Sequence, residues 1–90
     1  MNNLNLKQEL LVITMEECAE LTQSCSKIIR FSEDDILDVE DISNLQDEVG
    51  DVACMIELLK EFKLVDDNKI KKRIKVKRAK LKKWSSLFNE

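Results

Sequence analysis

The chain has 90 residues, with 15 basic and 18 acidic side chains, no proline, one glycine and three cysteines. This length allows one small domain, residues 1–90, whose core gives little stability without disulfides, a metal or oligomerisation. The near absence of proline and glycine argues against short strands joined by tight turns and favours long helices, so we expect an all-α fold.

The three cysteines, Cys18, Cys25 and Cys54, are not expected to form disulfides or a zinc site. Their number is odd, none belongs to a C-x-x-C pair, and histidine is absent. We expect small, buried residues in a reducing cytoplasm. The N-terminus lacks a signal-peptide pattern, and no apolar run is long enough to span a membrane. These features predict a cytoplasmic protein with no membrane partner, stabilised by oligomerisation.

The first helix is expected from about Leu6 to Phe31, with Asn5 and Gln8 at the spacing of an N-terminal cap. One face follows helical spacing and consists of Leu6, Leu10, Ile13, Glu17, Glu20, Leu21, Ser24 and Ile28. Two glutamates within an apolar stripe are unusual. Their three-residue separation places both side chains on one side of the helix.

An acidic connector is predicted for residues 32–42, followed by a second helix from about Ser43 to Lys63. Ser43 and Gln46 have the spacing of a capping box. The apolar stripe of this helix consists of Leu45, Val49, Val52, Ile56, Leu59 and Phe62.

A second acidic pair, Glu48 and Asp51, is predicted to lie beside that stripe with the spacing of the first pair. Gly50 stands between them, and a glycine inside a helix costs about 1 kcal/mol relative to alanine. Its presence suggests that another helix or a ligand approaches the backbone there. A tolerated surface glycine is the alternative.

A third helix is expected after Asp66 and Asp67, and it has the strongest charge asymmetry in the chain. From Lys69 to Lys83 there are ten basic residues and no acid. Its apolar face consists of Ile70, Ile74, Leu81, Trp84 and Phe88. Such a segment can bind a phosphate backbone, but the formal net charge of -3 argues against nucleic acid as the partner.

The two acidic pairs converge if the first two helices pack as an antiparallel hairpin. Burying unpaired charges costs several kcal/mol per group, and a divalent cation with a preference for oxygen compensates for them. Mg²⁺ is often shared with substrate phosphates, and the lack of histidine argues against a softer metal. Acids at this spacing also occur on solvated helix faces, and the spacing alone does not separate the two interpretations.

Two strings surround these acids: Glu16-Glu17-Cys18-Ala19-Glu20 and Glu48-Val49-Gly50-Asp51-Val52. They follow the pattern E-E-x-x-E, a gap and E-x-x-D, which resembles the MazG-like branch of the all-α nucleoside triphosphate pyrophosphohydrolases. The resemblance covers roughly residues 10–59. It implies Mg²⁺-dependent hydrolysis of nucleoside or deoxynucleoside triphosphates to monophosphate and pyrophosphate, with Mn²⁺ able to substitute for Mg²⁺.

The resemblance also implies roles for individual carboxylates. The metal ligands would be Glu17, Glu20, Glu48 and Asp51. The candidate catalytic residues are Glu16, Glu17 and Glu48, with Glu16 in a supporting part, and which carboxylate acts as the base stays open. Positive side chains are expected on the outer phosphates: Lys27 and Arg30 of the first helix, and Lys72, Arg73 and Lys80 of the third. A solvated face or a subunit contact is the alternative for the basic helix.

Proteins of this family usually pair through their helices. We therefore expect an antiparallel hairpin plus a third helix that complete a four-helix-type bundle in a homodimer or homotetramer. Three alternatives remain. The first is phosphoribosyl-ATP pyrophosphohydrolase, which has the same fold and similar carboxylate pairs. The others are a non-catalytic helical oligomer and a nucleic-acid-binding module that uses the basic helix.

Overall fold

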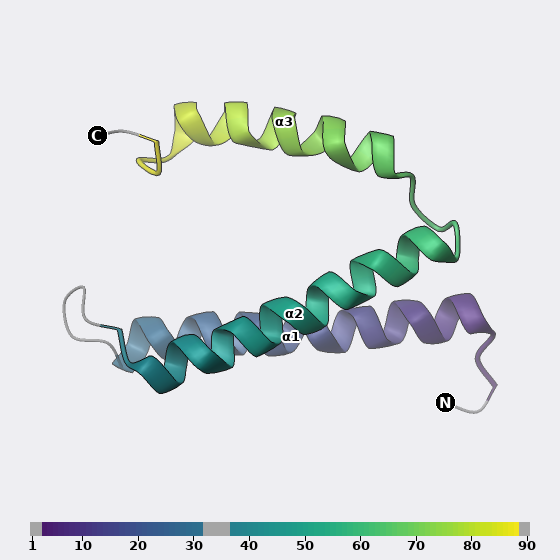
Figure 1. Cartoon of the computed structure of the whole chain (residues 1–90), viewed down its shortest axis with the longest axis horizontal. Helices are drawn as coiled ribbons and strands as arrows, with labels where there is room; N and C mark the ends of the chain where they lie inside the picture. The colour runs from purple at the N-terminus through teal and green to yellow at the C-terminus, as the bar shows by residue number, and fades with distance from the viewer. Residues whose placement is uncertain (1–2, 32–36, 89–90) are drawn as a thin grey trace.

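The computed structural model describes residues 3–31 and 37–88. It contains α1 (Leu6–Phe31), α2 (Val39–Glu61) and α3 (Asp67–Trp84). Helices α1 and α2 pack side by side in opposite directions, and α3 runs apart from them (Figure 1). The described residues contain no strand, which confirms the all-α prediction. No helix within them has the length and apolarity needed to cross a membrane.

The start of α1 agrees with the prediction from the sequence. The backbone N–H of Gln8 donates to Asn5 Oδ1 at 2.8 Å, and the backbone N–H of Asn5 donates to Gln8 Oε1 at 3.0 Å. This reciprocal pair satisfies two of the backbone donors that a helix start leaves without partners.

Helix α2 begins earlier than predicted. Asp38 is its N-cap, and Asp38 Oδ1 accepts a hydrogen bond from the backbone N–H of Glu40 at 2.8 Å. The expected start at Ser43 is therefore wrong, because an aspartate cap was present one turn upstream among the acids assigned to the connector. Residues 32–36 of that connector lie outside the described residues.

The end of α2 is closed by a Schellman motif, in which the chain reverses with a residue in the left-handed conformation. Lys63 takes that conformation with φ 59°. The N–H of Leu64 donates to the carbonyl of Leu59 and the N–H of Lys63 to that of Lys60, both at 3.0 Å. The helix therefore stops at Glu61, two residues before the predicted end.

The small core lies between α1 and α2, where Leu10 and Met55 are the buried apolar residues. On α1 the predicted stripe is largely correct, although Leu6 and Glu20 are exposed. On α2 the side chains that face α1 are shifted from the predicted stripe. Val49 is 50 % exposed, whereas Met55 is 6 % exposed. Met55 lies seven residues from Glu48 on the same face, so the half-buried Glu48 belongs to the packed face rather than beside it.

Two further expectations are corrected. All three cysteines are exposed in this chain rather than buried, because they lie on the outer faces of α1 and α2. Gly50 is also exposed, and a Cβ built at this position would meet no described atom within 4 Å. The expected close approach by another helix of the same chain is therefore not found, and the alternative of a surface glycine describes Gly50 in the single chain.

Helix α3 begins as predicted, after the cap Asp66, whose Oδ2 accepts from the backbone N–H of Lys69 at 2.9 Å. None of its residues is buried. The expected apolar face is present but uncovered by this chain, with Ile74 52 % and Trp84 82 % exposed. Asp67 connects the helix to α2 through an ion pair with Lys60 at 2.8 Å.

Candidate functional site

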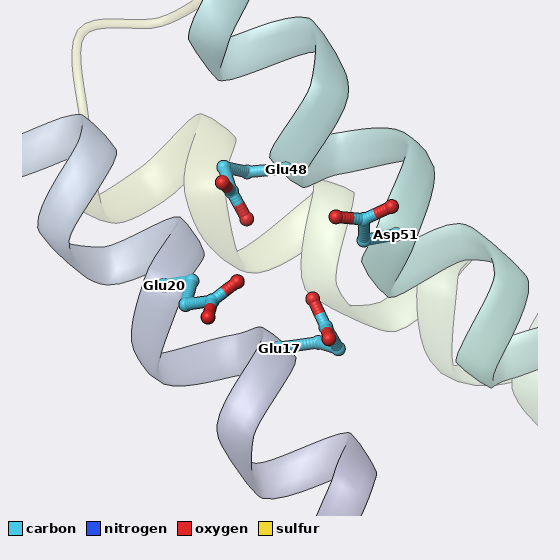
Figure 2. A group of neighbouring side chains, drawn as sticks. All are labelled: Glu17, Glu20, Glu48 and Asp51. Atoms are coloured by element: carbon cyan, nitrogen blue, oxygen red, sulfur yellow. The ribbon is translucent and has the colours of Figure 1, made fainter.

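The two acidic pairs meet between α1 and α2, as the sequence predicted. Glu17 and Glu20 come from α1, Glu48 and Asp51 come from α2, and the four carboxylates turn toward one another (Figure 2). One oxygen atom from each residue lies within 4.8 Å of the other three. The antiparallel packing of the hairpin produces this arrangement, because it sets two pairs of three-residue spacing opposite each other.

Among the described residues, no cation forms an ion pair with the four carboxylates of the cluster. Glu17 Oε2 and Glu48 Oε2 are buried, and neither has a hydrogen-bond partner among the described residues. Burial raises the pKa of Glu17 and that of Glu48 above their ordinary value of 4.5. The carboxylates of Glu20 and Asp51 raise both pKa values further by repulsion. A ligand with positive charge would favour the ionised form of these two groups.

The donor set fits a hard divalent cation. All four groups are carboxylates, the oxygen ligands that Mg²⁺ and Mn²⁺ accept, and no nitrogen or sulfur donor takes part. Opposite ligands of an octahedral Mg²⁺ lie about 4.2 Å apart, twice the Mg–O distance. Adjacent ligands lie about 3.0 Å apart, so a spacing of up to 4.8 Å needs the side chains to close on the ion, or waters in place of some direct contacts.

A cavity of about 360 Å³ adjoins the cluster and shares Glu48 with it. Two of the predicted phosphate-binding residues, Lys27 and Arg30, line this cavity from α1. The other lining residues were not predicted from the sequence: Gln23, Ser24, Asp41 and Asn44. Helical spacing could have found two of them, because Ser24 lies four residues after Glu20 and Asn44 four residues before Glu48.

The remaining candidates lie outside the cluster. Glu16 is exposed on α1 and is not among the four converging carboxylates. Lys72, Arg73 and Lys80 are exposed on α3. Arg73 lines a cavity at the α2–α3 junction and Lys80 a depression on α3, and neither contains a carboxylate of the cluster. The role of these three cations stays a prediction.

Comparisons with protein-family models, with curated proteins and with solved structures found no match to this chain. The likeness to the MazG-like family thus depends on the two motifs themselves. The carboxylate geometry is an independent observation, because it follows from how the helices pack.

Proposed function

We propose that the protein is a Mg²⁺-dependent pyrophosphohydrolase that converts nucleoside or deoxynucleoside triphosphates to monophosphate and pyrophosphate. The observation that carries the proposal is the set of four carboxylates within 4.8 Å on two facing helices. The cavity beside them supports it, since Lys27 and Arg30 add positive charge next to Glu48. A metal ion and cationic side chains that lie side by side suit a polyphosphate, because both neutralise its negatively charged oxygens.

Two groups of side chains would have separate roles in this reaction. Glu17, Glu20, Glu48 and Asp51 would hold the cation, which neutralises phosphate oxygens and lowers the pKa of a bound water. Lys27 and Arg30 would bind the outer phosphates and fix the direction of the substrate. Glu17 and Glu48 are also candidates for the base, because a carboxylate oxygen that does not bind the cation could accept a proton from that water.

We also propose a homo-oligomer, as a dimer or tetramer, in the cytoplasm. In this chain α3 leaves the apolar side chains of Ile74, Val76 and Trp84 exposed, and a second copy could cover them to complete a bundle. The three free cysteines fit a reducing compartment. The oligomer would also decide whether Lys72, Arg73 and Lys80 reach a bound phosphate.

The test is to incubate the purified protein with Mg²⁺ and a panel of triphosphates, and to identify the products by chromatography. Monophosphate plus pyrophosphate, lost with EDTA and in Glu48→Gln, would support the proposal. Glu57→Gln is the matched control, because Glu57 is exposed on the same helix and lies outside the cluster. Diphosphate plus orthophosphate would contradict the proposed reaction.

Turnover of phosphoribosyl-ATP, without turnover of free triphosphates, would instead identify the histidine-pathway enzyme of similar fold. A second candidate, binding of nucleic acid by α3, is favoured by the full exposure of its basic residues. Salt-sensitive binding to unrelated duplexes that is the same in Glu48→Gln would support this candidate.

A further inference from the structure

We infer that the cavity beside the carboxylate cluster receives the polyphosphate end of the substrate, and that Asn44 is a substrate-binding residue there. This inference rests on the proposed function and names the part of the substrate that the chain recognises. The nucleobase is not read in this cavity, so the substrate class is defined by its polyphosphate.

The chemistry of the lining favours a polyphosphate over a nucleobase. The described lining residues are Gln23, Ser24, Lys27, Arg30, Asp41, Asn44 and Glu48. All of them are polar or charged. Sites for flat organic groups are lined mainly by apolar and aromatic side chains, and bases stack on aromatic rings. None of these residues has an aromatic or aliphatic hydrocarbon side chain on which a base could stack, and two cations and several neutral donors suit phosphate oxygens.

The order of the lining residues along α1 indicates in which direction a bound phosphate chain would run from the metal site. Starting from Glu20, α1 presents Gln23 and Ser24 and then Lys27, and seven residues of helix span about 10 Å. Long helical side chains point back toward their own N-terminus. The side chain of Lys27 is therefore expected to extend toward the cluster, and a phosphate chain that leaves the metal site would meet it.

Asn44 occupies the corresponding position on α2. It lies one helical turn before Glu48, and both residues line the cavity. Its side-chain NH₂ can donate to a phosphate oxygen between the metal site and the cations. The charges of Lys27 and Arg30 are matched by those of Asp41 and Glu48. A divalent cation in the cluster would offset two of its four negative charges beside the cavity, so polyphosphate binding is expected to require Mg²⁺.

The probe for this inference is the bismethylene analogue of inorganic tripolyphosphate, whose P–C bonds resist hydrolysis. Calorimetry with Mg²⁺ is expected to show binding that weakens about tenfold or more in Lys27→Gln and in Asn44→Asp, because one loses a cation and the other adds a negative charge. Lys7→Gln and Asn68→Asp make the same chemical changes at exposed positions outside the cavity and should bind like the unaltered protein. Circular dichroism confirms folding, and Arg30→Gln replaces any variant that does not fold.

Unphosphorylated nucleosides are expected not to bind in this calorimetric experiment. In the activity assay, Asn44→Asp should lower kcat/KM for every triphosphate by a similar factor. If nucleosides bind and the tripolyphosphate analogue does not, or if Asn44→Asp reorders the preference among bases, the inference is wrong.

The outcome separates this inference from the proposed function. Hydrolysis of triphosphates without binding of the analogue would overturn the inference and leave the function standing. Binding of the analogue that depends on Lys27 and Asn44, without any hydrolysis, would support the inference and contradict the pyrophosphohydrolase.

Discussion

The α1–α2 hairpin and α3 each gather side chains of one charge, but they place them in different surroundings. The hairpin brings four carboxylates together, two half-buried and two exposed, beside a core that contains Leu10 and Met55. Helix α3 has ten basic residues between Lys69 and Lys83, and none of its residues is buried. Repulsion in α3 is therefore weakened by solvent, whereas repulsion in the hairpin persists until a ligand neutralises it.

This difference shows where each part obtains its stability. The hairpin has a core of its own and a carboxylate cluster whose negative charge a cation would neutralise. Helix α3 has an apolar face that the chain does not cover, with Ile74 and Trp84 exposed. The stability of the hairpin should thus depend on metal and pH, and the stability of α3 should depend on protein concentration.

The largest effect is expected from Glu48→Gln, which removes one ligand and one charge from the cluster. Activity with Mg²⁺ should fall about 100-fold or more, because an interaction with the charged reacting groups is lost. The thermal stability of the metal-free protein should rise, because repulsion in the cluster decreases. Steady-state kinetics and melting curves with EDTA measure the two effects. A variant that keeps its activity would show that the cluster is a structural feature.

Met55→Ala and Ile74→Ala test the contrast between the two regions directly. Removal of the buried Met55 side chain should lower the free energy of unfolding by about 2–3 kcal/mol at any protein concentration. The effect of Ile74→Ala should depend on concentration, because in the proposed oligomer this side chain would act through contacts between copies. Urea unfolding at several concentrations separates the two. A concentration-independent loss at Ile74 would mean that α3 is stabilised within one chain.

The pH dependence of stability should differ with and without metal. The raised pKa values of Glu17 and Glu48 mean that the folded metal-free protein binds protons more tightly than the unfolded chain. Stability should therefore fall as the pH rises from the ordinary value of 4.5 through the raised pKa values. Saturating Mg²⁺ should reverse this trend, because metal binding requires deprotonated ligands.

Asp67 provides an internal contrast for the same titration. Hydrogen bonds from Lys60 and Lys71 lower its pKa below the ordinary value of 3.8. The contribution of ionised Asp67 to the free energy of unfolding is fully present above pH 3.8 and is lost only as the pH falls through its lowered pKa. Melting curves recorded below pH 3.8 and above pH 4.5 would measure the two effects separately. A metal-free protein that becomes steadily more stable above pH 4.5 would contradict the account of the cluster.

The smallest effect is expected at Lys63, between the two regions. A non-glycine residue in the left-handed conformation carries a backbone penalty, and Lys63 has φ 59°. Lys63→Gly should stabilise the protein by up to about 1 kcal/mol in urea unfolding. Lys69→Gly, inside α3, should destabilise it by a similar amount and is the control. Equal effects of the two substitutions would show that the end of α2 is not strained.

Much of the hairpin could be predicted from the sequence, because its signals are local. The cap formed by Asn5 and Gln8, the stripe on α1 and the acidic spacing all depend on residues within a turn or two of each other. The start of α2 was missed because Asp38 is one of many acids in its segment. Propensity does not show which of them takes the cap.

The burial of single residues could not be predicted in the same way. Both Val49 and Met55 are apolar, and the crossing of α1 with α2 decides which of them is covered. The cysteines were expected to be buried because of their type, yet their helix faces point outward in a chain with so small a core. The cavity residues Gln23 and Asn44 were missed because a neutral amide gives no signal before its neighbours are known.

The junction at Asp67 has a mechanical consequence. One carboxylate contacts both Lys60 of α2 and Lys71 of α3, at 2.8 and 3.1 Å, and all three side chains are at least one-third exposed. Ion pairs of this kind contribute about 0–1 kcal/mol each. Of the two ion pairs, Lys60–Asp67 joins α2 to α3, whereas Asp67–Lys71 lies within α3. A partner that covers the apolar face of α3 would therefore change the angle between α3 and the hairpin against little resistance from this ion pair.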